Sequence, residues 1–314
     1  MRLTCIAEAV DDGRRAVDVL CRQAGISHLL GKKIRLYGDL QVNGIHHRMI
    51  DPVHSGDRLA AEYSAPDEMP SGARCEPAAG IEIRYEDDWL VVADKPPHLL
   101  THPAYDGQTD SLITALTSHR LHPVSRLDRN TSGLVVLAKN GHSHHVISHS
   151  SMVKRYLGIT FGCWYPSDGT VDRPIARAPG SIVLRQTDPT GSPAVTRYRT
   201  LAVWRRGDLA FSRMVFELET GRTHQIRVHC LSAGCPLVGD GLYGLEQAPA
   251  GLQQAYAALT APLSEQIDRQ SLHAAYLAFR HPVTREPLVF ESAVRPDICR
   301  LAAWLDAWSG PASF

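Results

Sequence analysis

The sequence predicts an α+β protein in which a mixed, mainly antiparallel sheet with flanking helices follows a small α/β module. The 314 residues suit two domains. Apolar strand patterns follow one another without helices at regular intervals, which favours an antiparallel sheet over a doubly wound parallel one. A stretch rich in Pro, Gly and Ala separates two differently patterned regions, so we expect domains at residues 1–65 and 81–314, joined by a linker at 66–80.

The composition excludes several classes of protein. No apolar run approaches the roughly 18 consecutive residues of a membrane-spanning helix, and the N-terminus lacks a signal-peptide pattern, so we expect a cytoplasmic protein without membrane contact. The seven cysteines are scattered without a C-x-x-C pair, which argues against a disulfide framework and a zinc site. Lys plus Arg and Asp plus Glu each total 33, so the net charge does not by itself indicate nucleic-acid binding.

The first 65 residues have the pattern of a compact unit. A strand is expected at 3–8 and a helix at 14–23, and Ser27 is a favourable N-cap for a second helix. Asn43 and Gly44 form a strong two-residue hairpin signal, and 58–63 is expected to be the last strand.

Basic side chains follow the second of these helices, at Lys32, Lys33 and Arg35. The order of two short helices and a hairpin resembles the small RNA-binding module that ribosomal proteins, some synthetases and many RNA-modifying enzymes share. The resemblance implies that these cations contact RNA. The alternative is a generic α/β cap.

The second region is dominated by strand patterns, with helical patterns between some of them. The expected strands are 81–85, 89–93, 134–138, 156–161, 194–203, 209–218, 274–279 and 288–290. The expected helices are 111–118, 142–151, 222–233, 252–259 and 297–308.

Two stretches carry candidate chemistry. Asp128 lies between Arg126 and Arg129 in a turn-forming segment before an apolar strand, where neighbouring cations keep a nucleophile or general base ionised. The residues alone favour a surface salt-bridge cluster that supports a turn. In the second stretch, "ETGRTHQIRVH", Arg222 lies near the start of a predicted helix and Arg227 can reach a carboxylate elsewhere.

Three other patterns are interpreted as structural. The segment 239–244, "GDGLYG", matches G-x-G-x-x-G, but no strand feeds it and no βαβ unit follows, so no dinucleotide is expected. "GISHLLGKK" is a near miss of a phosphate-binding loop. The histidines of "NGHSHHVISHS" have no carboxylate or thiol at ligand spacing, and we expect them on a polar helix face without a metal.

Four motifs in one order resemble those of the RluA-type pseudouridine synthases. They are "VVADKPPHLLTHP" at 91–103, "RLDRNTSGLVVLAKN" at 126–140, "KRYLGITFG" at 154–162 and "LETGRTHQIRVHCLSAGCPLVGDGLYG" at 218–244. The match spans about residues 81–291, and members of the family often carry the small RNA-binding module as an N-terminal appendage.

The resemblance implies roles for individual side chains. Asp128 corresponds to the catalytic aspartate, Tyr156 to the active-site tyrosine that packs on the target base, and Arg227 to the arginine that pairs with the aspartate. The position before Arg126 is usually histidine in the family and is Ser125 here. This departure affects the hydrogen bond of that histidine and leaves the aspartate in place.

RNA contacts follow from the same resemblance. Arg126 corresponds to the residue that enters the RNA stack in place of the flipped uridine, and Arg129 and Arg222 are candidate RNA-binding residues. Leu272 is the candidate for the apolar residue that closes the pocket.

The function implied is the isomerisation of specific uridines in structured RNA, with ribosomal RNA favoured over transfer RNA. The reaction transfers no outside group and involves no net redox change, so we expect no cofactor and no metal. A monomer is expected. The residues leave open whether Asp128 attacks the ribose or the base. The alternative function is that of a non-catalytic RNA-binding or ribosome assembly protein on the same fold.

We predict that deleting residues 1–65 weakens RNA binding more than it lowers the maximal rate. Each phosphate contact to single-stranded RNA contributes about −0.7 to the slope of log affinity against log salt, so loss of three basic contacts flattens the slope by about two units. Binding titrations at several salt concentrations, with steady-state kinetics of the truncated protein, measure both quantities. An unchanged slope, or a collapse of the rate at saturating RNA, contradicts the prediction.

Overall fold

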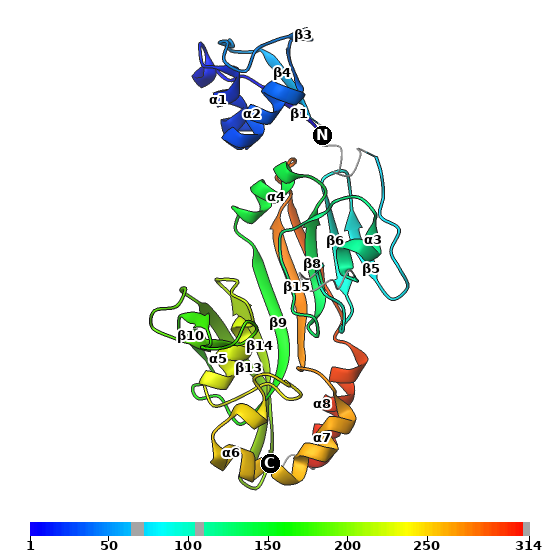
Figure 1. The fold of residues 1–314 in the computed structure, drawn as a ribbon, viewed down its shortest axis with the longest axis vertical. Coiled ribbons are helices and arrows are strands. Elements are labelled where there is room, and N and C mark those ends of the chain that lie inside the picture. Colours follow the sequence, from blue (N-terminus) through cyan, green and yellow to red (C-terminus); the bar gives the residue numbers. More distant parts are fainter. Residues whose placement is uncertain (64–71, 104–109, 310–314) are drawn as a thin grey trace.

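The protein forms two separate sheets, together with a short two-stranded one (Figure 1). The computed structural model describes residues 1–63, 72–103 and 110–309. The larger sheet has ten strands, eight of them in the order β10-β13-β14-β9-β15-β8-β6-β5, with β16 beside β15 and β7 beside β8. Among the described strands of this sheet, β15 and β8 are the parallel pair and the other pairs are antiparallel. The predicted fold class is confirmed.

The first 62 residues build their own four-stranded sheet, in the order β1-β4-β2-β3, with two helices packed against it. Ser27 caps the second helix by accepting a hydrogen bond from the Leu30 amide at 3.1 Å. Asn43 and Gly44 adopt positive φ angles in the predicted hairpin turn. The elements are β1 Arg2–Ile6, η1 Ala9–Asp11, α1 Ala16–Gln23, α2 His28–Tyr37, β2 Asp39–Val42, β3 Ile45–His46 and β4 Arg58–Glu62.

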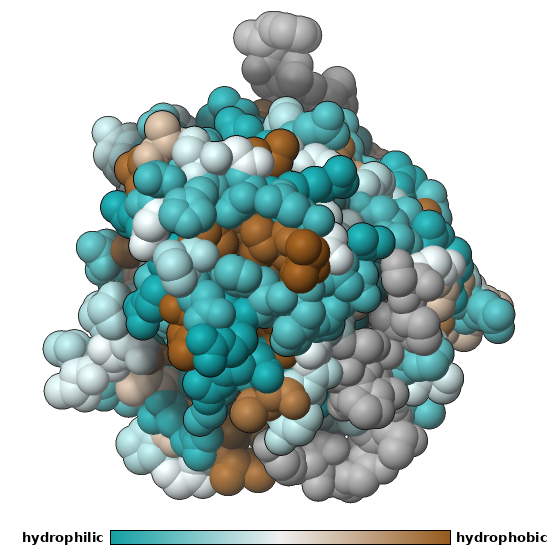
Figure 2. All heavy atoms as spheres, turned by 90° about the horizontal axis from the view of Figure 1, so that it is seen from above, coloured by the Kyte–Doolittle hydropathy of each residue, from teal (hydrophilic) through white to brown (hydrophobic). Residues whose placement is uncertain are grey.

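The surface of this module exposes several large hydrophobic side chains, among them Leu29, Tyr37 and Ile45, beside polar ones. Seen from above in Figure 2, hydrophobic side chains form small separate groups among polar ones. Lys32, Lys33 and Arg35 are all exposed on α2, where the ammonium group of Lys33 lies 5.8 Å from the ring centre of Tyr63. The three cations are therefore accessible to solvent.

The large sheet contains the expected strands and several short strands that the sequence did not predict. Its strands are β5 Glu82–Glu86, β6 Leu90–Lys95, β7 His122–Pro123, β8 Ser132–Ala138, β9 Val153–Phe161, β10 Asp168–Asp172, β13 Val195–Arg206, β14 Leu209–Leu218, β15 Leu272–Arg280 and β16 Pro287–Glu291. The separate hairpin consists of β11 Ile175–Arg177 and β12 Arg185–Thr187.

Helices cover this sheet at several places. They are α3 Leu112–Leu116, α4 Gly141–Ser148, α5 Gln225–Ser232, α6 Ala250–Tyr256, α7 Thr260–Gln266 and α8 Pro296–Ser309, with short 3-10 turns η2 Leu245–Gln247 and η3 Ala257–Leu259. The helix α5 lies against β12 and β13, and α8 lies against β13 and α7. No helix in the described ranges is long and apolar enough to cross a membrane.

The histidine-rich helix α4 differs from the expected polar face. His142 is 2% exposed and makes an edge contact with the Trp89 ring, with centroids 6.3 Å apart. Val146 and Ile147 are buried on the same helix, which packs on β8. The prediction of a polar face is therefore wrong for His142, because the helix uses that side to pack. Burial lowers the pKa of His142 to about 4, so the imidazole is neutral.

Part of the predicted linker packs along α3. The amides of Glu76 and Ala78 donate hydrogen bonds to the carbonyls of Leu116 and Ala115, and Cys75 is buried. Residues 66–71 of the predicted linker lie outside the described residues. The division into two functional domains remains a prediction.

The parallel contact between β8 and β15 depends on Gly133. The residue pairs with Ala274 and has a φ of +113°. A Cβ atom at this position would lie 2.3 Å from the Ala274 carbonyl oxygen. Because the loop that precedes β8 carries Asp128, this close approach also fixes the start of the strand beside that residue.

We predict that Gly133→Ala lowers the free energy of unfolding by about 2–4 kcal/mol, since it combines a positive φ with overpacking. Gly180→Ala is the matched control, because its φ is +71° and no atom would lie within 4 Å of the added Cβ. Urea unfolding followed by circular dichroism measures both variants. Equal losses in the two variants contradict the packing argument.

Candidate active site

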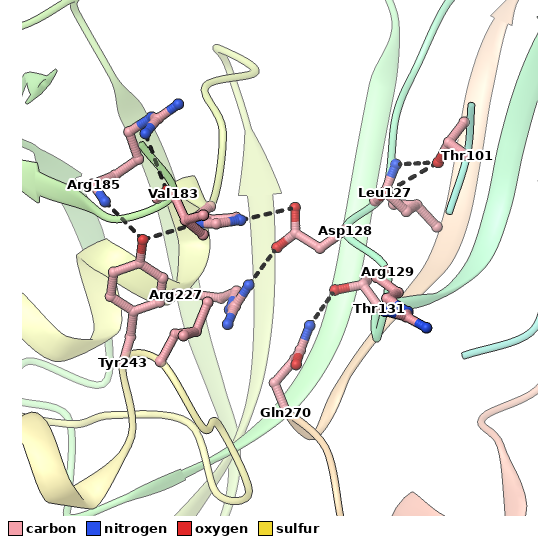
Figure 3. Close-up of polar contacts among 12 residues, drawn as sticks. Thr101, Leu127, Asp128, Arg129, Thr131, Val183, Arg185, Arg227, Tyr243 and Gln270 are labelled. Carbon is pink, nitrogen blue, oxygen red and sulfur yellow. Dashed lines mark hydrogen bonds and ion pairs between the residues drawn. The ribbon is translucent and has the colours of Figure 1, made fainter. Parts of the chain in front are cut away.

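Asp128 lies in the loop before β8 and faces the helix α5. Figure 3 shows its carboxylate directed at the guanidinium of Arg227, and the two groups are 3.0 Å apart. The Asp128 side chain is 25% exposed, whereas that of Arg227 is 6% exposed. Arg227 thus binds one oxygen of Asp128, and the carboxylate remains partly accessible to solvent.

Arg227 is anchored mainly by a second carboxylate, that of Asp240. Its Nε and Nη2 atoms donate to the two oxygens of Asp240, both at 2.7 Å, while Nη1 donates to Asp128. The Asp240 side chain is fully buried and also accepts the amide hydrogens of Leu242 and Tyr243. Burial opposes the charge on Arg227, but the hydrogen bonds and charges of Asp240 and Asp128 outweigh it and raise the pKa of Arg227.

The loop carrying Asp128 is held by side chains from other parts of the chain. Thr101 Oγ1 accepts the Leu127 amide hydrogen at 3.1 Å and donates to the Leu127 carbonyl at 2.9 Å. Gln270 donates to the hydroxyl of Thr131 at 3.1 Å, as Figure 3 also shows. Residues on both sides of Asp128 are therefore fixed, which preorganises the carboxylate.

A buried lysine supports the same loop. Lys95, at the end of β6, is 0% exposed, and its ammonium group donates to the carbonyls of Pro96, Leu99 and Arg129 at 2.7–3.0 Å. Burial lowers the pKa of Lys95 to about 7, while the charge of Asp128 acts in the opposite direction. Lys95 was not predicted as a site residue, because nothing in its spacing shows which carbonyls it binds.

Tyr156 lies on β9 and is 6% exposed. Burial, and then the charge of Asp128, raise the pKa of Tyr156, so its phenol is neutral at physiological pH. Leu272, at the start of β15, is 3% exposed and belongs to the same apolar cluster as Tyr156. The structure thus brings Asp128, Arg227 and Tyr156 together and places Leu272 in the apolar cluster that contains Tyr156.

The candidate RNA-binding arginines are exposed around this centre. Arg126 and Arg129 flank Asp128 on its loop, and Arg129 donates a long hydrogen bond of 3.4 Å to the His98 carbonyl. Arg222 precedes α5 and donates to the Pro193 carbonyl at 2.9 Å. Lys32, Lys33 and Arg35 are not part of this cluster, because α2 packs against the four-stranded sheet of the first module.

Ser125 forms a contact with the neighbouring strand. Its hydroxyl accepts the Val136 amide hydrogen at 3.2 Å. At the position where the resembled family usually has histidine, this side chain therefore bonds to the backbone of β8. The loop keeps a side-chain tie to the strand despite the substitution.

The segment 239–244 contributes two site residues that the sequence analysis passed over. Asp240 is the buried partner of Arg227, and the Tyr243 ring centre lies 5.0 Å from the guanidinium carbon of Arg227. Gly239 has a φ of +77°, and a Cβ there would lie 2.2 Å from the Arg269 carbonyl. The glycines of this segment therefore form a tight turn. The acidic residue among them was the sequence signal that could have identified Asp240 as a site residue.

Within residues 1–63, 72–103 and 110–309, no group of three or more His, Cys, Asp or Glu side chains is arranged to hold a metal ion.

We predict that Asp240→Asn lowers the free energy of unfolding by about 3–5 kcal/mol, because it leaves the buried Arg227 without its main counter-charge. Activity should fall as well, since Arg227 then no longer has a fixed orientation. Thermal unfolding and turnover are the measurements. Asp172→Asn, at an exposed carboxylate on β10, is the control and should change stability by less than about 0.5 kcal/mol. Equal stability of the two variants contradicts the anchoring role of Asp240.

Comparison with known proteins shows which family this chain resembles. A family model described as RNA pseudouridylate synthase matches residues 89–232. An uncharacterised RNA pseudouridine synthase of Bacillus subtilis, YjbO, is 33% identical over 292 residues, which is 89% of this chain and 95% of that protein. The ribosomal large subunit pseudouridine synthase D of Pseudomonas aeruginosa is 35% identical over 282 residues, 85% of this chain and 84% of that protein.

A solved structure gives the same result for the fold. The human RNA pseudouridylate synthase domain containing 4 superposes with a TM-score of 0.53 at 26% identity, covering 71% of this chain and 92% of its own. The resemblance stated from the motifs is thereby confirmed. This chain belongs to the RNA pseudouridylate synthase family and is an RNA isomerase.

Proposed function

We propose that this protein converts specific uridines of ribosomal RNA to pseudouridine and that Asp128 is its catalytic carboxylate. The observation that carries the proposal is the half-buried Asp128, of which Arg227 holds one oxygen at 3.0 Å. Relatives named ribosomal large subunit pseudouridine synthase D support ribosomal RNA as the substrate.

The geometry suits the chemistry of the reaction. The glycosidic bond of uridine must break, the base must turn, and a new bond must form to carbon 5. A carboxylate oriented by Arg227 attacks the ribose or the ring, or stabilises a cationic sugar. Arg227 aims the group in each case. Because atoms are only rearranged within the uridine, the chain needs no external group donor and no redox cofactor for this reaction.

The target uridine has to leave the RNA stack to reach Asp128. Extrusion of a base costs a few kcal/mol, and stacking on an aromatic side chain contributes about 1–3 kcal/mol per base. In this proposal Tyr156 packs on the uracil, Leu272 closes the pocket, and the exposed Arg126 takes the place of the extruded base. A protein that only bound RNA would not require Asp128, Tyr156 and Arg227 to converge.

The remaining basic residues position the RNA backbone. Arg129 and Arg222 are exposed near the site, and Lys32, Lys33 and Arg35 are exposed on α2. Phosphate contacts of this kind orient RNA without reading its sequence. The cytoplasmic location and the monomeric state expected from the sequence remain predictions.

We predict that Asp128→Asn abolishes isomerisation while RNA affinity stays within a few-fold of wild type, because the amide keeps the shape of the side chain and loses its charge. Release of tritium from carbon 5 of labelled uridine measures turnover, since this hydrogen leaves when the new bond forms. Asp168→Asn, on the outer strand β10, is the control and should release tritium normally. Tritium release by Asp128→Asn at the wild-type rate refutes the proposed role.

A further inference from the structure

His224 faces the side of Asp128 that Arg227 leaves open. Its Nε2 atom lies 4.0 Å from Asp128 Oδ1, whereas Arg227 binds Oδ2. The separation is longer than a hydrogen bond, and the His224 side chain is 13% exposed. An imidazole thus lies beside the reacting carboxylate without yet binding it.

The imidazole is fixed at its other nitrogen. His224 Nδ1 and the Tyr243 hydroxyl are 2.8 Å apart, and this hydroxyl accepts the Arg185 amide hydrogen, also at 2.8 Å. The hydroxyl hydrogen is then available for Nδ1, which leaves the ring hydrogen on Nε2. This tautomer is favoured because the opposite one would direct a lone pair of Nε2 at a carboxylate.

Burial keeps the His224 imidazole neutral at neutral pH. Burial is the largest cause and lowers the pKa of His224 below its usual value. Asp128 and Asp240 act in the opposite direction, while Arg227 and Arg185 act in the same direction as burial. A neutral Nε2–H group orients a carboxylate without neutralising it.

The backbone at His224 is in a conformation that few residues favour. His224 precedes α5 with φ +58° and ψ 19°, in the left-handed region. Asn adopts this region more readily than most non-glycine residues, because its short side chain bonds locally. Histidine is also enriched in this region, so the backbone accepts either residue and does not by itself explain which of the two is present.

We propose that His224 is a positioning residue for Asp128. When the RNA closes the site, Nε2–H binds Oδ1, so that His224 and Arg227 together fix both oxygens of the carboxylate. This inference rests on the proposed function of Asp128. The chain of contacts runs from the β11–β12 hairpin through Arg185, Tyr243 and His224 to Asp128. Figure 3 labels Arg185, Tyr243 and Asp128.

Two substitutions at this position separate positioning from a structural role. The amide nitrogen of His224→Gln can reach the place of Nε2, whereas that of His224→Asn reaches only the place of Nδ1. Asn suits the left-handed backbone better. We expect His224→Asn to lower kcat about ten- to hundredfold at unchanged KM, as for loss of a hydrogen bond to a charged group. His224→Gln should retain more activity, although its melting temperature is lower than that of His224→Asn.

A matched control lies on α5, the helix that His224 precedes. His229 is buried on α5 and bonds to the Thr196 hydroxyl and the Arg173 carbonyl, away from Asp128. His229→Gln should lower the melting temperature and leave kcat unchanged. If His229→Gln lowers kcat as much as His224→Asn does, or if His224→Asn turns over as fast as His224→Gln, the positioning role is refuted.

A double substitution tests the link to Tyr243. If the Tyr243 hydroxyl acts through His224, then Tyr243→Phe lowers kcat in the wild-type background and has no further effect on kcat in His224→Asn. Additive effects refute the link. Tritium release by the wild-type protein, with none from Asp128→Asn, shows that the proposed function stands even where these results fail. Absence of release by the wild type refutes both.

Discussion

The site depends on one buried guanidinium that is shared by two carboxylates. Arg227 gives two of its nitrogens to Asp240 and a third to Asp128. Arginine has a planar set of donors that binds one carboxylate through two nitrogens and the other through the third, a bidentate geometry that an ammonium group does not offer. Asp240 supplies the buried counter-charge, so Asp128 does not have to be buried to hold Arg227. The carboxylate of Asp128, which has to contact RNA, is thus oriented while it remains accessible.

Residues far apart in the chain meet here because of the strand order of the large sheet. The parallel contact of β8 with β15 brings the loop of Asp128 beside Arg269 and Gln270, while β13 and β14 carry α5 with Arg227 to the opposite side. The parallel contact requires Gly133, where any side chain would overlap the backbone of β15. The β8–β15 contact at Gly133 thus helps to fix the position of the loop that carries Asp128.

Features that depend on a few neighbouring residues could be predicted from the sequence. The Asn43-Gly44 turn, the Ser27 cap and the apolar strands β6, β8 and β14 have local causes, and the structure contains them. The pairing of Asp128 with Arg227 across 99 positions could be anticipated only through resemblance to a family. Partners of buried polar groups follow from tertiary packing, so the partners of Lys95 and Asp240 were not predictable, although an acidic residue inside the glycine pattern could have marked Asp240 as a candidate. Likewise, periodicity could not show that His142 is buried, since its neighbours on α4 include several polar residues.

The most direct test of this account is the modification of ribosomal RNA in cells whose only copy of the gene carries Arg227→Lys. Lysine keeps the positive charge but cannot bond two carboxylates with a planar set of donors. Pseudouridine mapping should then show the target uridine unmodified, as in cells without the gene, and modified when the wild-type gene is restored. Full modification with Arg227→Lys would show that charge alone is sufficient and that the shared guanidinium is not the constraint on which the site depends.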